Sequence, residues 1–288
     1  MRSTLHALGW LAVLAPLLAA PARASTYSSA VLADHPLHYW RLGESSGAAV
    51  DAVSAGGVNG TYNNAPTLGV AGAIAGDPDT AVQFGSATGA AGKAVTFASA
   101  LGISGNFTGT WELWFNAPSY SVAGLAYTGL NANLSAFELV EGQALTGSLS
   151  VAFDGGYAWE SNGSIFSLNQ WHYLVGTKTP GAIGAGTTAI YLDGVLLAGH
   201  VTGGGGTPNV TDSSHYIGRH GDPTDSYPFP GSLDEVALYN VALTQAQVTA
   251  HFLAGTQPVP EPATLGLLLL GAAVGARRVR RGAASPAG

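Results

Sequence analysis

Two short patterns in this sequence hold residue types that could do chemistry. The segment Gly43-Glu44-Ser45-Ser46-Gly47 fits Gly-x-Ser-x-Gly, in which a nucleophilic serine stands between a strand and a helix. The residues that follow it are too few and too rich in glycine for that helix. Asp234 and Glu235 form a carboxylate pair, but neighbours on a strand point to opposite faces and cannot act together on one bond. Neither pattern predicts catalysis.

Acidic residues in turns are candidates for holding calcium, because this ion prefers oxygen ligands supplied by loops. Asp222 and Asp225 are three residues apart in a polar segment and form one such candidate site. The alternative is that these aspartates cap turns by accepting backbone N–H groups, which needs no metal. The histidine pairs, His35 with His38 and His215 with His220, come without a clear third ligand and predict no zinc site.

Aromatic side chains in loops are candidates for stacking against sugar rings. Tyr157 and Trp159 are two positions apart, so they share a face just after a turn. Tyr120, Tyr127 and Tyr227 are further aromatic residues that we expect in loops. Burial in the core is an alternative for Trp159, and the sequence does not separate the two.

Composition and charge limit the class of protein. The chain has 288 residues with 41 glycines, no cysteine and only 9% charged residues, which disfavours a helical bundle and excludes disulfides and thiolate metal sites. Residues 25–255 hold 16 acidic and 4 basic residues. A net charge of -12 repels phosphate backbones, so we expect no nucleic-acid partner, whereas divalent cations and neutral polymers stay open.

Alternating apolar residues predict many short strands. Residues 110–115 and 148–153 alternate as half-buried strands do, and further strands are expected at 81–84, 93–97, 136–140, 171–176, 215–218 and 232–239. Asp193-Gly194 lies between the apolar runs 189–192 and 195–197, which predicts a hairpin with a type I′ turn. We therefore predict an all-β fold, an antiparallel jelly-roll sandwich of two sheets.

One short helix is expected after the last strand, over residues 244–253. Thr244 fits its N-cap, with Gln247 completing a capping box, and Gly255 is expected to end it.

The N-terminus has the pattern of a signal peptide. Arg2 precedes the apolar run 8–20, and Ala22 and Ala24 form the small-residue site that a signal peptidase cleaves. We predict a signal helix in residues 1–24, export, and a mature chain that starts at Ser25.

The C-terminus combines a Pro-rich linker at 256–262 with a short apolar helix and a basic tail at 263–288. The apolar run 263–276 gives about 21 Å of helix, less than a bilayer core, and the arginines favour the cytoplasmic side. The order of parts resembles the PEP-CTERM sorting signal of Gram-negative bacteria; its motif residues here are Pro260, Glu261, Pro262, Arg277, Arg278, Arg280 and Arg281. The resemblance implies transient anchoring in the inner membrane and processing by an exosortase-type protease. An ordinary membrane tail is the alternative.

Three ordered blocks in residues 25–255 resemble a LamG-type, concanavalin A-like domain. They are residues 36–51, with His38-Tyr39-Trp40-Arg41-Leu42-Gly43-Glu44; residues 171–194, with Trp171-His172-Tyr173 and Asp193-Gly194; and residues 231–244, with Leu233-Asp234-Glu235-Val236. The resemblance implies a binding module for glycans or matrix proteins. It also implies a structural calcium ion between the first segment and the closing strand, at Glu44, Asp51 and Asp234. The Glu-x-Asp-x-x-Glu strand of the retaining glucanases of this fold does not occur in the sequence.

The sequence therefore predicts an exported, non-catalytic protein of the cell surface or extracellular matrix of a Gram-negative bacterium. Its expected partner is exopolysaccharide, another polysaccharide or a matrix component, bound through loops of the sandwich. A structural or adhesive matrix protein without a discrete ligand site is the alternative, and a glycoside hydrolase is a third class. The sequence names no cofactor except the calcium just described.

Overall fold

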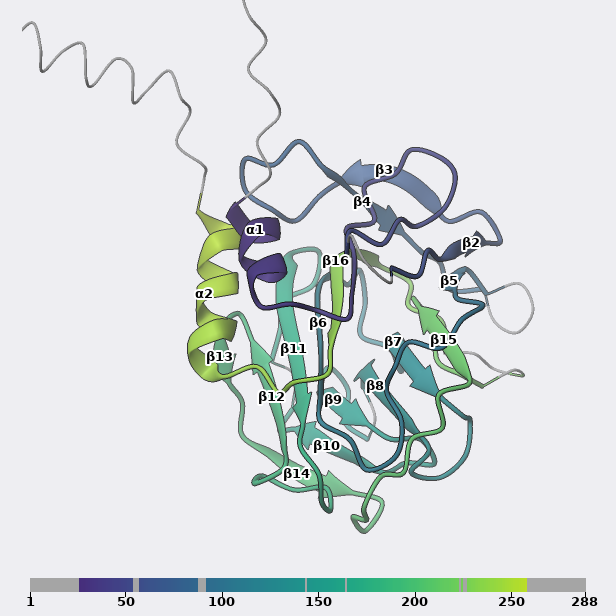
Figure 1. Ribbon diagram of the computed structural model, residues 1–288, viewed down its shortest axis with the longest axis vertical. Helices are drawn as coiled ribbons and strands as arrows, with labels where there is room; N and C mark the ends of the chain where they lie inside the picture. Colours follow the sequence, from purple (N-terminus) through teal and green to yellow (C-terminus); the bar gives the residue numbers. More distant parts are fainter. Residues whose placement is uncertain are drawn as a thin grey trace, which may run out of the picture.

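A computed structural model describes residues 26–53, 57–87, 92–142, 144–163, 165–222, 224 and 227–257 (Figure 1). The expected signal peptide, with Ala22 and Ala24, lies outside the described residues, as do Asp225, the PEP motif and the arginine tail. Within the described residues, the strands form two eight-stranded sheets, and all strand pairs are antiparallel. The predicted two-sheet sandwich is thus confirmed.

The first sheet is built around three largely buried strands of eight residues each. Its order is β13 (Val195–Leu196), β12 (Thr188–Leu192), β11 (Trp171–Lys178), β6 (Gly109–Asn116), β16 (Ser232–Tyr239), β4 (Thr80–Gln83) and β3 (Thr67–Ala71), and β1 (His38–Trp40) also pairs with β16. The expected hairpin joins β12 to β13. Asp193 and Gly194 have φ angles of 50° and 79°, the positive values that a type I′ turn requires.

The second sheet carries the candidate site. Its order is β14 (Gly199–Thr202), β10 (Ala158–Ser161), β9 (Leu149–Ala152), β8 (Ala136–Glu141), β7 (Ala123–Gly129), β15 (Ser214–Ile217), β5 (Ala94–Thr96) and β2 (Thr61–Asn63). Along β8 the residues alternate: Phe137 and Leu139 enter the main core, whereas Glu138 and Val140 lie on the opposite face of the sheet. The second sheet therefore has one apolar face and one face of mixed polarity.

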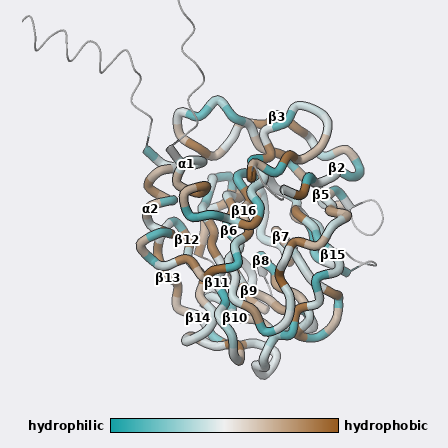
Figure 2. The backbone as a smooth tube through the Cα atoms, in the orientation of Figure 1, coloured by the Kyte–Doolittle hydropathy of each residue, from teal (hydrophilic) through white to brown (hydrophobic). Residues whose placement is uncertain are grey.

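The main core fills the space between the two sheets. Trp111 and Phe115 of the first sheet and Phe137 and Val151 of the second are fully buried there. A Cβ added to Gly176 of β11 would lie 2.4 Å from Leu139 Cδ2, so the sheets approach too closely here for any larger residue. Figure 2 shows hydrophobic and hydrophilic stretches interspersed along both sheets, as expected of strands with one face in a core.

Two helices, α1 (Thr26–Ala33) and α2 (Gln245–Thr256), lie side by side on the outer face of the first sheet (Figure 1). They bury a second apolar cluster, which includes Tyr27 and Trp114. The capping box of Thr244 and Gln247 is present as predicted. The expected end at Gly255 is wrong by one residue, because Gly255 packs against Trp114 and the helix continues to Thr256.

Candidate functional site

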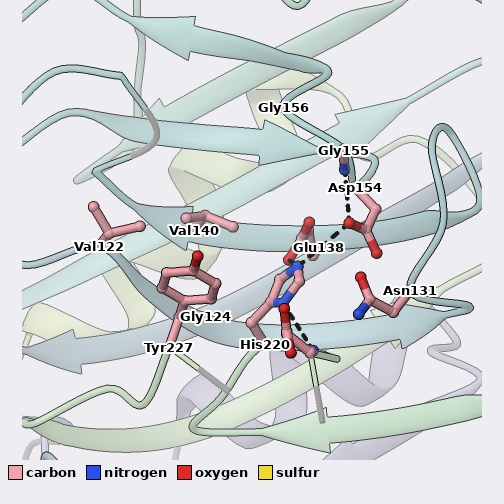
Figure 3. A pocket seen from close by; sticks show the side chains of 11 residues that line it. Val122, Gly124, Asn131, Glu138, Val140, Asp154, Gly155, Gly156, His220 and Tyr227 are labelled. Atoms are coloured by element: carbon pink, nitrogen blue, oxygen red, sulfur yellow. Dashed lines mark hydrogen bonds and ion pairs between the residues drawn. The ribbon is translucent and has the colours of Figure 1, made fainter. Parts of the chain in front are cut away.

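A pocket of about 410 Å³ opens on the face of the second sheet that is turned away from the main core (Figure 3). We call it the sheet-face pocket. Strands β7 and β8, the turn after β9 and the loop between β15 and β16 supply its walls, which consist of Val122, Gly124, Asn131, Glu138, Val140, Asp154, Gly155, Gly156, His220, Asp222 and Tyr227. Val140, Ala152 and Ala158 form a small apolar cluster under it.

Glu138 is the most deeply buried carboxylate of this pocket. Its side chain leaves β8 on the pocket side, and the residue is 1% exposed. Its Oε2 atom accepts no hydrogen bond from the described residues. A buried acceptor without a donor costs about 1–3 kcal/mol. The one ion-pair partner of Oε2 among the described residues is His220 Nε2, at 3.5 Å, so the oxygen can accept a shorter hydrogen bond from a ligand.

Asp154 forms the second acidic wall. It occupies the turn after β9 with a φ angle of 70°, and its Oδ1 accepts the N–H of Gly155 at 2.6 Å. With its amide nitrogen turned toward the aspartate, Asn131 donates to Oδ2 at 3.0 Å, and the Tyr127 hydroxyl donates to the same oxygen at 3.3 Å. These donors fix the carboxylate, which lies beside His220 and Asn131 in Figure 3.

His220 joins the two carboxylates. Its Nε2 atom lies 3.5 Å from Glu138 Oε2 and 3.8 Å from Asp154 Oδ1, so the two oxygens are at most about 7 Å apart. Its Nδ1 accepts the N–H of Asp222 at 2.9 Å, which places the proton of the neutral ring on Nε2. Burial alone would lower the pKa of His220, but the charges of Glu138, Asp154 and Asp222 raise it above its usual value. A second proton would have to displace the Asp222 N–H from Nδ1.

Two glycines allow the loop of His220 to lie against the sheet. A Cβ on Gly124 of β7 would stand 2.3 Å from the backbone nitrogen of His220, and one on Gly221 would stand 2.2 Å from the Tyr127 ring. Both contacts are far inside van der Waals distance, so any larger side chain at Gly124 must push the loop away from the sheet. The pocket therefore depends on these glycines.

The aromatic residues predicted from the sequence fall in different places. Tyr227 lines the sheet-face pocket and is 37% exposed. Tyr120 is equally exposed but lines an adjoining hollow of about 190 Å³, which shares Val122 with the sheet-face pocket, and its hydroxyl donates to the Phe166 carbonyl. Tyr157 and Trp159 are half-buried and pack against the main core. The expectation that Tyr127 lies in a loop is wrong: it belongs to β7 and is fully buried, because the loop of His220 covers it.

The residues proposed for a first calcium site are each engaged within the protein. Asp51 accepts His38 Nδ1 at 2.6 Å and the backbone N–H groups of Tyr39, Val53 and Val58. Burial alone would raise the pKa of Asp51, but these donors lower it below its usual value. Glu44 accepts the N–H of Val50 at 2.7 Å, so both residues stabilise local loops.

Asp234 and the residues around it form an ion cluster at the junction of the first segment and the closing strand. Asp234 Oδ2 accepts the N–H of Ala73 at 2.8 Å. Burial, followed by the charge of Glu235, holds the pKa of Asp234 well above its usual value. One guanidinium nitrogen of Arg41 lies within 2.9 Å of oxygens of Asp77, Asp79 and Glu235. Arg41 therefore pairs with three carboxylates of this junction, whereas Asp234 Oδ1 is buried and accepts no hydrogen bond from the described residues.

The described part of the chain contains no group of three or more histidine, aspartate or glutamate residues able to hold a metal ion. Of the second proposed calcium site, Asp222 lines the sheet-face pocket and its Oδ1 accepts the N–H of Thr224 at 2.7 Å.

A chain of Ser167, His172 and Asp193 is a second constellation that the sequence did not indicate. His172 Nδ1 lies 2.8 Å from Asp193 Oδ2, and its Nε2 lies 2.9 Å from the Ser167 hydroxyl oxygen. The backbone N–H of Ser167 also donates to Nε2, at 3.2 Å. The imidazole therefore links the loop before β11 to the β12–β13 turn, and it also contacts the Ser167 hydroxyl.

The sheet-face pocket combines residues that sequence analysis treated separately or missed. The prediction of a strand at 136–140 indicated which face Glu138 occupies. No sequence signal placed Asp154 and His220 beside it, because Asp154 comes to Glu138 through the pairing of β8 with β9, and His220 through the pairing of β7 with β8 and with β15. The arrangement offers carboxylate acceptors, an amide, an imidazole and an exposed tyrosine ring, a set suited to binding a hydroxyl-rich ligand.

These features define a two-sheet antiparallel sandwich with a polar pocket on the face of one sheet. The chain belongs to the family described as concanavalin A-like lectin/glucanases superfamily, whose model matches residues 87–249. The resemblance seen in the sequence is thus confirmed. Residues 258–281 match the PEP-CTERM protein-sorting motif, which indicates export and sorting to the cell envelope or surface. No curated protein matches the chain.

Solved structures match the chain at low sequence identity. The binding domain of Paraclostridial Mosquitocidal Protein 1 matches with a TM-score of 0.53 and 14% identity, over 77% of this chain and 52% of the other. A sialidase from Trypanosoma rangeli has a TM-score of 0.48 and 17% identity over 76% of this chain. Domain 4 of an extracellular arabinanase from Geobacillus stearothermophilus, in complex with arabinotriose, matches with a TM-score of 0.48 and 18% identity. The match covers 75% of this chain and 97% of that domain. This chain spans 33% of the sialidase's length.

No helix in the residues that the structure describes is both long and apolar enough to cross a membrane.

Proposed function

We propose that this protein is a non-catalytic polysaccharide-binding protein of the surface or extracellular matrix of a Gram-negative bacterium. The sorting motif at 258–281 supports its delivery to the envelope, where processing by an exosortase-type protease releases it from transient anchoring in the inner membrane. The single observation that carries the binding function is the Oε2 atom of Glu138, which is buried in the wall of a 410 Å³ pocket and has His220 Nε2, at 3.5 Å, as its one ion-pair partner among the described residues.

The pocket suits a sugar for two reasons. Sugar hydroxyls are hydrogen-bond donors, and Glu138 Oε2 has no donor among the described residues closer than His220 Nε2 at 3.5 Å; Asp154 and Asn131 can bind further hydroxyls at the rim. The Tyr227 ring, 37% exposed, offers a face on which a sugar ring can stack. The volume accommodates one or two sugar rings of a longer polymer, because the pocket is open to solvent.

The position of His220 favours binding over cleavage. The most common mechanism for hydrolysing a glycosidic bond uses two carboxyl groups, one on either side of that bond. Here the imidazole lies within 4 Å of both Glu138 and Asp154, where a scissile bond would have to lie.

A glycan array with the purified full-length chain in mild detergent tests the binding function. Tyr227→Ala is expected to lower binding at least tenfold. Tyr120→Ala is the matched control, because Tyr120 has the same exposure and lines a different hollow. Loss of binding in the control alone would move the site to that hollow. Failure of the unaltered protein to bind any glycan would favour a structural or adhesive matrix role.

Repeating the array with a chelator tests the predicted calcium. A structural ion at Glu44, Asp51 and Asp234, or one at Asp222 and Asp225, would make binding or thermal stability fall when calcium is removed.

Labelling of Ser167 tests the proposal that the protein is not an enzyme. We expect no labelling by a fluorophosphonate probe, because the Ser167 N–H shares His172 Nε2 with the hydroxyl. Labelling that disappears in Ser167→Ala would show an activated serine, and release of reducing ends from a bound polysaccharide would show a glycosidase.

A further inference from the structure

The sheet-face pocket has an unusual charge balance, which bears on the kind of glycan it accepts. Its described lining residues include the three acidic residues Glu138, Asp154 and Asp222, and its only basic group is the imidazole of His220. The nearest arginine, Arg219, turns away: its guanidinium donates to the backbone carbonyls of His220 and Asp222 and stacks over the Tyr216 ring. The pocket therefore presents negative charge to a ligand.

Glu138 places part of this negative charge inside the pocket. Its Oε2 atom accepts no hydrogen bond from the described residues although the residue is 1% exposed, and it faces the pocket interior (Figure 3). Hydrogen bonds to a charged partner are about twice as strong as those between neutral groups. A ligand with a cationic donor therefore gains more from this oxygen than a ligand with a hydroxyl, and an anionic ligand is repelled.

We propose that the sheet-face pocket selects glycans with a free amino group, whose ammonium contacts Glu138 and Asp154 from the pocket side, next to His220. This inference rests on the proposed polysaccharide-binding function and adds the substrate class. Uronic-acid and sulfated polymers are excluded by the same carboxylates. An N-acetylated amino sugar loses the charge and keeps only its neutral hydrogen bonds.

The ammonium and a proton on His220 repel each other, so binding depends on pH. The groups that face the ring are Glu138 from β8, Tyr127 from β7, Asp154 after β9, and Asp222 and Tyr227 from its own loop. Arg219 is adjacent along the chain, and Asp225, in the same loop, lies outside the described residues. As pH rises, the affinity for the amine first increases, because His220 loses its proton. At higher pH the affinity decreases again, because the ligand amine loses its own proton. His220→Gln removes the lower limb of this profile.

Calorimetric titration of the full-length chain in mild detergent tests the inference with three probes: a glucosamine hexamer, an N-acetylglucosamine hexamer and a galacturonate hexamer. We expect the amine to bind at least tenfold more tightly than the acetylated oligomer and the anionic oligomer not to bind. Glu138→Gln keeps the shape and an acceptor, so it should abolish the preference while retaining the acetylated ligand. Glu141→Gln is the matched control on the same strand, because Glu141 does not line this pocket.

The outcomes separate this inference from the function on which it rests. Equal affinity for the amine and the acetylated oligomer, or tighter binding of the anion, overturns the amine selection and leaves glycan binding standing. Failure of every oligosaccharide to bind overturns both. Binding of calcium chloride alone that is lost in Glu138→Gln and that blocks the glucosamine hexamer would make the pocket a metal site and would also overturn the proposal.

Discussion

Nδ1 of His251 in helix α2 lies 3.0 Å from Oε2 of Glu112, a fully buried residue of strand β6. The other ring nitrogen lies 3.1 Å from Asp34, just after helix α1. The hydroxyls of Tyr27 and Tyr239 also donate to Glu112, at 2.8 and 3.2 Å. The two helices are thus joined to the first sheet by a buried polar network as well as by apolar contacts.

This network predicts a pH-dependent stability. Burial alone would lower the pKa of His251, but Glu112 and then Asp34 raise it above its usual value. A raised histidine pKa gives stability that is complete below about pH 6.5, the value of the unfolded chain, and is lost as pH rises through the folded pKa. Urea unfolding from pH 5.5 to 9 should show this loss, and His251→Gln should make it smaller, while the contributions of His220 and Glu141, whose pKa values are also raised, remain. His200→Gln, at a 43% exposed side chain, should keep the profile of the unaltered protein.

Arg41 predicts a large loss of stability when it is replaced. Its guanidinium pairs with Asp77, Asp79 and Glu235, and the Glu235 side chain is 0% exposed. Arg41→Met leaves these charges unpaired and is expected to cost about 3–5 kcal/mol of unfolding free energy. Lys93→Met should change it by less than about 0.5 kcal/mol, since Lys93 forms no ion pair with a described residue. Equal effects of the two changes would contradict the ion cluster.

Replacing Glu141 with its neutral isostere glutamine is expected to raise stability, whereas Arg41→Met lowers it. Burial raises the pKa of Glu141 to about 7, although Ser121 donates to it through its N–H at 2.7 Å and its hydroxyl at 3.2 Å. The native state therefore holds a proton that the unfolded chain releases near pH 4.5, so stability falls between these values by up to about 3 kcal/mol. Glu141→Gln keeps the hydrogen bond from the Ser121 N–H and can donate its own amide N–H to the Ser121 hydroxyl, so it should be the more stable protein at pH 8. Parallel profiles of melting temperature against pH for the two proteins would be inconsistent with this.

Gly124 predicts a link between backbone packing and binding. A methyl group there would stand 2.3 Å from the backbone nitrogen of His220, so Gly124→Ala must displace the loop. We expect a loss of about 1–3 kcal/mol in stability and at least tenfold in glycan affinity. Gly184→Ala is the control, because its Cβ meets nothing within 4 Å. An unchanged affinity in Gly124→Ala would show that the position of the loop does not matter for the ligand.

Removal of residues 258–288 is expected to change where the protein is found in the cell envelope but not how it folds. The core residues between the sheets and under the helices all lie in the retained part, and the deleted part carries the sorting motif. The shortened chain should melt within about 2 °C of the full-length chain and should lose its retention in the envelope fraction. A molten shortened chain would show that the domain extends beyond residue 257.

Local patterns in the sequence determined the parts of the fold that depend on near neighbours. Alternation at 110–115 gave β6, Asp193-Gly194 gave the β12–β13 turn, and Thr244 with Gln247 gave the start of α2. The sorting motif was also readable, because a processing signal is recognised as a linear segment. In each case the physical cause acts over a few residues: side-chain periodicity, backbone conformation or a capping hydrogen bond.

Only the tertiary structure decided which residues share the pocket. Glu138, Asp154 and His220 lie on different strands and loops, and their meeting depends on strand register and on a close approach at Gly124. The same contacts bury Tyr127 and leave Tyr227 exposed, although both are tyrosines in polar surroundings. The Arg41 cluster likewise joins residues up to 194 positions apart. A single sequence does not state such pairings, because the energy of a side chain in a sheet depends on neighbours that the fold supplies.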